Sequence, residues 1–162
     1  TLPLHDALPT YLPDAGREPA AARLAASLAG GSLSRALEME EGSAGTARQG
    51  LIERLRTLTL EEITPLFAAA EELAADRERA VEALGTLTSL LRDVLLIQGG
   101  SNEVVNRDLV DLLEEEACRM SPERTLTRLG HVMEARQALQ RNANPRLTMD
   151  VLLMRLADRT TP

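Results

Sequence analysis

The near absence of aromatic side chains is the feature that most limits what this chain can fold into. Its 162 residues include one Phe, one Tyr and no Trp, but 30 Leu and 23 Ala. Leu and Ala are strong helix formers, whereas the core of a sheet or sandwich normally draws on Val, Ile and aromatic residues. The composition therefore predicts an all-α protein. With 44% of its residues hydrophobic, the chain can bury a substantial core in one domain, or in one domain with a small appendage.

The charge balance bears on possible partners. All 18 basic residues are Arg, and 25 acidic residues outnumber them, so the formal net charge is -7. Nonspecific binding to nucleic acid depends on clustered cations that release counterions from the phosphates. An acidic chain is unsuited to a broad phosphate-binding surface, so we expect any link to DNA to be indirect.

Cysteine usage and hydropathy indicate a soluble protein of a reducing compartment. The lone Cys118 cannot form an internal disulfide, and the Cys and His residues do not have zinc-binding spacing. No apolar run approaches the roughly 20 residues that a membrane-spanning helix needs, and no secretory signal is visible. We expect a cytoplasmic protein with no metal site and no membrane contact.

No motif in the sequence supports catalysis by this chain alone. Phosphate loops of the form GxxxxGK[ST], GxGxxG turns, HExxH and GxSxG are all absent, and the only histidines are His5 and His131. We expect His5 to be solvated and His131 to be a partly buried structural residue. The chain also begins at Thr1 rather than at Met. We therefore expect a non-catalytic fragment of a longer protein whose upstream part carries any chemistry.

Apolar spacing and capping residues divide the chain into helices. The first 18 residues are rich in Pro and admit at most a broken helix. The predicted helices run over residues 19–29, 32–39, 47–58, 65–75, 77–98, 106–119, 122–141 and 145–157. Small and polar residues at 40–45 predict a boundary between a short N-terminal part and a longer helical bundle.

Several helix ends are indicated by single residues. Asp76, Ser121 and Asn144 are placed to cap the helices that follow them, and Pro occupies the first helical position after the last two. Gly99 and Gly100 stop the long helix that ends at residue 98, and Asn106 opens the next one. A left-handed Asn142 is expected to end the helix over 122–141.

The start of the helix over 65–75 is less regular. Thr59 and Glu62 have the spacing of a capping box. Pro65 would remove an interior hydrogen bond from a helix that began at Leu60. We therefore expect a single turn followed by a restart at Pro65.

The apolar faces predict which helices are buried. Helix 77–98 has apolar residues at helical spacing, with Arg92 and Asp93 among its polar positions. In helix 122–141 the apolar residues include Leu126, Val132 and Met133. Helix 145–157 is apolar over most of its circumference, so we expect it to lie buried among neighbours or to pack in an oligomer.

Three consecutive glutamates, Glu114 to Glu116, could be interpreted as a cation site. A site for a hard cation needs convergent oxygens, whereas successive helix positions diverge by about 100° each. We expect a solvated helix face instead.

A short motif, GSLSRAL at residues 31–37, places Arg35 in the first turn after a Ser cap. It resembles the second sensor motif in the helical lid of AAA+ ATPases. In that family the Arg reaches toward the phosphates of the bound nucleotide, for which a guanidinium offers a rigid fork of donors. The resemblance implies that Arg35 senses nucleotide. The alternative is a surface Arg on a small helix.

Further motifs resemble the collar of the bacterial DNA polymerase III clamp loader, particularly its delta-prime subunit. They are LLRDVLL at residues 90–96, LQRNANPRL at 139–147 and LLMRLA at 152–157. The N-x-N-P-R-L turn and the immediate join of lid to collar favour delta-prime over the related gamma/tau and delta subunits. The family's phosphate loop, zinc-binding cysteines and arginine finger are absent from this chain.

The resemblance implies an AAA+ lid remnant over residues 1–41 and a helical collar over residues 42–162. It implies a subunit of the DNA polymerase III holoenzyme that joins other loader subunits to place the sliding clamp on primed DNA. The clamp and the DNA would be contacted only indirectly, and ATP would bind only through an upstream module. Two alternatives are a free-standing helical adaptor with an unrelated partner, and a parent protein that is an active ATPase using Arg35.

Overall fold

The computed structural model describes residues 43–158. Within that range the chain forms six α-helices, one 3-10 turn and no strand. The elements are α4 (Ser43–Thr57), α5 (Ile63–Leu73), α6 (Arg77–Gln98), the 3-10 turn η1 (Arg107–Leu109), α7 (Val110–Arg119), α8 (Pro122–Gln140) and α9 (Pro145–Ala157). The predicted all-α fold is confirmed.

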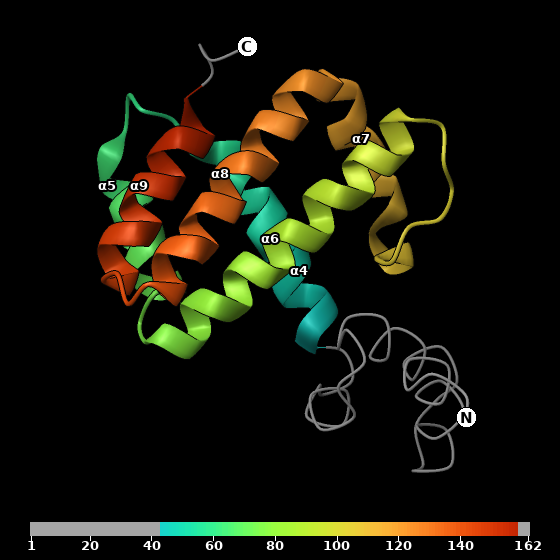
Figure 1. Cartoon of the computed structure of the whole chain (residues 1–162). Coiled ribbons are helices and arrows are strands. Elements are labelled where there is room, and N and C mark those ends of the chain that lie inside the picture. Colours follow the sequence, from blue (N-terminus) through green and yellow to red (C-terminus); the bar gives the residue numbers. More distant parts are fainter. Residues whose placement is uncertain (1–42, 159–162) are drawn as a thin grey trace, which may run out of the picture.

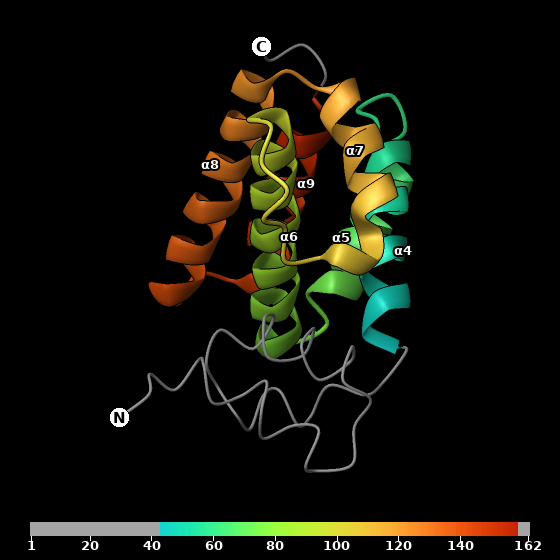
Figure 2. The same ribbon diagram turned by 90° about the vertical axis from the view of Figure 1, so that its right-hand side faces the viewer.

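Helix α6 lies in the middle of the bundle (Figure 1). In the view of Figure 2, α8 lies on one side of α6, while α4 and α7 lie on the other and α9 lies behind. α6 and α8 run in opposite directions, since Arg77 at the start of α6 contacts Leu139 at the end of α8. α9 packs against both α8 and α5, and it makes fewer contacts with α6.

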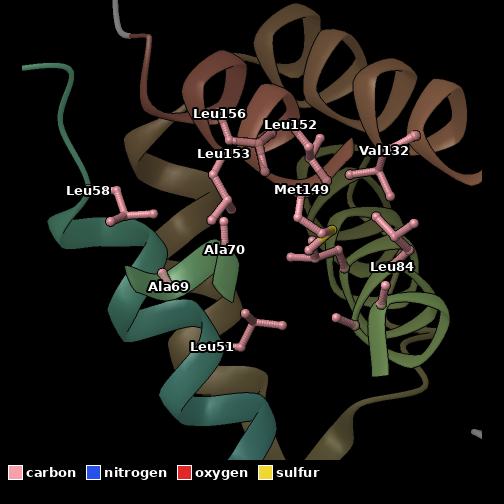
Figure 3. Packing of buried hydrophobic residues seen from close by; sticks show 14 of the residues in the cluster. Leu51, Leu58, Ala69, Ala70, Leu84, Val132, Met149, Leu152, Leu153 and Leu156 are labelled. Atoms are coloured by element: carbon pink, nitrogen blue, oxygen red, sulfur yellow. The ribbon is translucent and has the colours of Figure 1, made fainter. Parts of the chain in front are cut away.

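The main core collects aliphatic side chains from α4, α5, α6, α8 and α9. Figure 3 shows Leu84, Val132, Met149 and Leu153 turned toward the space that these helices enclose, and all four are fully buried. Burying one such side chain contributes about 1.5–3 kcal/mol. The core therefore holds together helices that are far apart in the sequence.

A second cluster lies between α4, the later half of α6, η1 and α7. It is formed by Ile52, Leu90, Val94, Leu109 and Leu113, of which Leu113 is fully buried. Because the first half of α6 belongs to the main core, one helix carries residues of both clusters. α7 is held to the bundle mainly through this second cluster.

The predicted side-chain caps of α6, α8 and α9 are confirmed. The side chains of Asp76, Ser121 and Asn144 each accept a hydrogen bond from the backbone N–H three residues on, at 2.8, 3.3 and 3.0 Å. The pKa of Glu123, in the first turn of α8, is lowered by a backbone N–H bond and by the Ser121 hydroxyl. The three capping side chains satisfy backbone N–H donors that the start of a helix leaves without partners.

Two residues adopt the left-handed conformation at helix ends, as was predicted for Asn142. Asn142 has φ 63° two residues after the end of α8, and Gly100 has φ 77° two residues after the end of α6. The N–H of Gly100 bonds to the carbonyl of Ile97 and that of Ser101 to the carbonyl of Leu96, which closes the last turn of α6. A side chain at position 100 would be strained, so Gly is favoured there.

The start of α5 differs from its prediction. Glu62 is itself the N-cap residue and no side chain caps the helix, so the predicted capping box with Thr59 is wrong. α5 begins at Ile63 rather than restarting at Pro65. Pro65 is the third residue of α5, where the backbone N–H has no acceptor within the helix, so Pro removes no hydrogen bond.

Two other boundaries also differ. α4 begins at Ser43, four residues before the predicted start at residue 47. The predicted helix over 106–119 is divided into η1 and α7, and the Asn106 side chain caps neither. The predicted helices at 19–29 and 32–39, with the predicted lid over 1–41, lie outside the described residues.

Helix α9 offers a matched test of core packing. Replacing the fully buried Leu153 by Ala is expected to lower the free energy of unfolding by about 2–5 kcal/mol, because it leaves a cavity in the main core. Leu147→Ala on the same helix removes a side chain that is 63% exposed, and a change below about 0.5 kcal/mol is expected. Urea unfolding followed by circular dichroism measures both. Equal losses in the two variants would contradict this packing.

Candidate assembly surface

Asp93 of α6 is a carboxylate with no solvent exposure. Its Oδ2 atom accepts hydrogen bonds from the backbone N–H of Val105 at 3.0 Å, and from both the backbone N–H and Nδ2 of Asn106 at 2.8 Å. Arg92 donates to the other carboxylate oxygen at 3.2 Å. A buried charge is tolerated where it is paired and hydrogen-bonded in this way. Asp93, one of the predicted polar positions of this helix, is therefore buried and not solvated.

The contacts of Asp93 hold the loop between α6 and η1. Asn106 is also fully buried, and its Nδ2 atom reaches Ser89 Oγ at 3.0 Å as well as Asp93. This explains why Asn106 does not cap a helix, since its side chain is turned toward α6. The aspartate of the LLRDVLL motif thus determines where α7 begins.

Arg77 joins the start of α6 to the turn between α8 and α9. Its Nη1 atom donates to the carbonyl oxygen of Leu139 at 2.7 Å, and its Nη2 atom donates to that of Ala143 at 3.1 Å. Carbonyls in the last turn of a helix have no partner within the helix, and a cation there is favourable. The LQRNANPRL turn is therefore held by α6.

Arg146, in the first turn of α9, joins that helix to α5. Its guanidinium donates to the carbonyl of Phe67 at 3.0 Å and forms ion pairs with Glu71 and Asp150, each at 3.1 Å. The hydrogen bond that Arg146 donates to Glu71, followed by the one it donates to Asp150, raises the pKa of Arg146 above its ordinary value. The second collar-like motif thus positions α9 through its asparagine cap and this arginine.

Helices α8 and α9 leave large aliphatic side chains exposed. We define the α8–α9 outer face by Leu126 and Met133 on α8 and Leu147 and Val151 on α9. Their exposed fractions range from 38% for Val151 to 63% for Leu147. An Arg155–Glu134 ion pair joins the exposed sides of the two helices. This face is the candidate surface for assembly with other proteins.

The final helix was predicted to be buried among neighbours or to pack in an oligomer. Met149, Leu153 and Leu156 are buried, whereas Leu147 and Val151 remain exposed. Among residues 43–158, burial therefore covers one side of α9 and leaves Leu147 and Val151 outside the core.

The exposure of Leu126 and Met133 follows from helix geometry. Leu126 and Met133 are seven positions apart, so they lie on nearly the same side of the helix, and the same holds for Val132 and Leu139. Leu126 and Val132 are six positions apart, which separates them by about 240° around the helix axis. The two pairs therefore occupy different faces of α8, and only the second pair is buried. Angular spacing could have separated them before the structure was known.

The glutamate run of α7 is only partly a solvated face. Glu114 and Glu115 are exposed as predicted, but the prediction is wrong for Glu116, whose side chain is 14% exposed. Arg56 of α4 donates to Glu116 at 2.6 Å and pairs with Glu115 at 3.1 Å. Burial alone lowers the pKa of Arg56, but the hydrogen bonds and charges of the two glutamates outweigh it and raise the pKa. These glutamates link α7 to α4.

The remaining candidate residues have simple surroundings. His131 on α8 is partly buried, as predicted, and Cys118 on α7 is exposed. No group of three or more His, Cys, Asp or Glu side chains within residues 43–158 is arranged to hold a metal ion. In the same part of the chain, every helix is too short or too polar to cross a bilayer. Arg35 and His5 lie outside the described residues.

Residues 44–158 match the family described as DNA polymerase III, delta subunit, C terminal. The match includes almost all of the helical bundle, from the second residue of α4 to the residue after α9. The chain belongs to this family. Its role is therefore that of a clamp-loader subunit of DNA polymerase III, which confirms the resemblance to the clamp loader. No curated protein matches the chain.

Asp93 provides a test of the loop that positions α7. Asp93→Ala removes a buried acceptor from three N–H donors and is expected to lower the free energy of unfolding by about 2–5 kcal/mol. The backbone amides of Val105 and Asn106 should then exchange hydrogen faster, because both bond to this carboxylate. Hydrogen exchange by NMR and urea unfolding measure the two effects. Asp111→Ala, at an exposed position of α7, is the control and should change neither.

Proposed function

We propose that this chain is the collar part of a delta-prime-like clamp-loader subunit, and that it assembles with other loader subunits through the α8–α9 outer face. The observation that supports this is the exposure of four large aliphatic residues on two adjacent helices whose other sides fill a closed core. Protein interfaces are apolar at their centre and polar at the rim. The Arg155–Glu134 pair and the polar residues around the aliphatic side chains fit such a rim.

In this proposal the chain acts as a scaffold. The aliphatic faces of α8 and α9 bury against a neighbouring collar and hold the ATPase modules of the loader in a ring. Those modules open the sliding clamp and place it on primed DNA, so this chain contacts the clamp and the DNA only indirectly. The net charge of -7 supports this, since it is unfavourable for binding to phosphates. The proposed location is the cytoplasm.

The delta-prime position is supported by the LQRNANPRL motif, whose turn is anchored by Arg77. The second candidate is the delta position, which the description of the matching family favours. Competition separates the two. A delta-prime-like chain should displace purified delta-prime, and not delta, from a collar of gamma/tau subunits in size-exclusion chromatography. Displacement of delta alone would establish the second candidate.

The assembly surface can be tested by introducing charge. Wild-type chain mixed with gamma/tau subunits should co-elute with them, whereas Met133→Asp and Val151→Asp should elute alone, because each places a carboxylate in an apolar interface. Both positions are more than a third exposed, so the thermal unfolding of each variant should remain close to that of wild type.

The control is Ile63→Asp at the start of α5, where the aliphatic side chain is 54% exposed and outside the α8–α9 outer face. This variant should still co-elute. Failure of the wild-type chain to co-elute with any loader collar would contradict the proposal and leave a free-standing helical adaptor as the function.

We also propose that Arg35 senses nucleotide bound by a module upstream of this chain. The support is the GSLSRAL motif. In the full parent protein, Arg35→Ala should slow ATP-dependent clamp loading by about tenfold or more, since a guanidinium that contacts phosphate in the active state typically contributes at least 1.4 kcal/mol. Clamp loading onto primed DNA measures the rate. An unchanged rate would show that Arg35 is a surface residue.

A further inference from the structure

A cavity of about 300 Å³ lies between α4, α6, α7 and the start of α8. None of the four residues that define the α8–α9 outer face lines it. Its interior is aliphatic and includes Leu55 of α4 with Leu91 and Val94 of α6. Cavities that bind small ligands or side chains begin at about this volume. The cavity is therefore large enough for aliphatic groups from another molecule.

The charged residues of this cavity are mostly of one sign. Its lining includes four arginines, Arg56, Arg119, Arg124 and Arg128, and one acidic residue, Glu116. Two acidic side chains, Glu115 and Glu116, pair with Arg56. In a chain with a net charge of -7, this is a local excess of positive charge beside an apolar interior.

Two of these arginines donate hydrogen bonds to backbone carbonyls at the end of α9. Arg124 Nη2 donates to the carbonyl of Asp158 at 3.1 Å, and Arg128 Nη2 donates to the carbonyl of Leu156 at 2.8 Å. The Asp158 carbonyl orients the Arg124 guanidinium without cancelling its charge. Each guanidinium has five N–H donors, so Arg124 retains donors for an additional acceptor.

Arg119 completes the charged side of the cavity. Its side chain is 60% exposed, and its nearest carboxylate oxygen, on Glu116, is 3.9 Å away. That separation is too long for a hydrogen bond. Arg119 and Arg124 can therefore present donors to an anion that lies next to the aliphatic interior.

We propose that this cavity binds an acidic peptide segment of a partner protein, with one or two Leu or Ile side chains in the cavity and flanking carboxylates on Arg119 and Arg124. Several arginines at one opening match a ligand with more than one negative charge, which favours an acidic peptide over a fatty acid with a single carboxylate. Aliphatic anchors that fill a pocket commonly dominate such binding, and carboxylates bind Arg through charge-assisted hydrogen bonds. This site goes beyond the proposed function and does not depend on assembly through the α8–α9 outer face.

Fluorescence anisotropy with the 162-residue chain and a fluorescein-labelled peptide of sequence EDLLED tests the proposal. Saturable binding is expected, and it should weaken as the NaCl concentration rises. Two matched peptides separate the contributions. QNLLQN lacks the carboxylates and EDSSED lacks the aliphatic side chains, and each should bind about tenfold more weakly or worse. Absence of EDLLED binding, or equal binding of QNLLQN, would overturn the proposal.

Variants place the site on the molecule. Arg119→Glu should weaken EDLLED binding about tenfold or more, whereas Arg107→Glu, an equal charge change at an exposed position of η1, should leave it unchanged. Leu55→Trp should abolish binding by filling the cavity, with circular dichroism confirming that the variant folds. Because Arg119 is exposed, its variant tests the site even if the cavity-filling variant unfolds. Equal effects of the two arginine variants would overturn the assignment.

Discussion

The burial of α6 is the constraint on which the rest of this structure depends. A helix of 22 residues lies in the middle of the bundle, with its first half in the main core and its second half in the cluster beneath α7. The hydrophobic effect is non-directional, so burial of aliphatic side chains favours a compact bundle but does not fix the position of each helix packed against α6. The positions of the neighbouring helices depend on polar contacts made at their ends.

Three charged residues supply those contacts. Asp93 holds the loop before α7, Arg77 holds the turn between α8 and α9, and Arg146 joins α9 to α5. Asp93 and Arg77 satisfy backbone groups that a loop or helix end leaves without partners, whereas Arg146 donates to a carbonyl within α5 and pairs with Glu71. Two of the three lie within the collar-like motifs, so the motifs describe how helices are joined. Their chemistry is architectural, in agreement with a scaffold inside a clamp loader.

The bundle presents two surfaces of different character. The α8–α9 outer face is aliphatic and suits contact with another helical subunit. The cavity between α4, α6, α7 and α8 combines an aliphatic interior with arginines, and suits a short acidic segment. The two surfaces share no defining residue.

Local features of the sequence determined the fold class and most helix ends. Composition excluded a sheet, and the capping residues Asp76, Ser121 and Asn144 gave the starts of the helices they precede, because a cap acts on backbone groups within three residues. The family was also predictable, since its motifs are short contiguous stretches. The same local reasoning was wrong at Thr59 and Glu62, where the capping-box spacing is present and the hydrogen bonds are not.

Only the tertiary structure decided which polar residues are buried and which apolar residues are exposed. Asp93 directly follows Arg92 in α6, yet their surroundings differ. Asp93 is buried under the loop that contains Val105, 12 residues later, whereas the Arg92 side chain is half exposed. Leu126 and Val132 both count as apolar in the sequence, but α6 covers the side of α8 that carries Val132. The arginines of the cavity come from α4, α7 and α8, and only Arg124 and Arg128 share a helical spacing. Burial depends on neighbours that are distant in the sequence, and their placement exists only once the chain has folded.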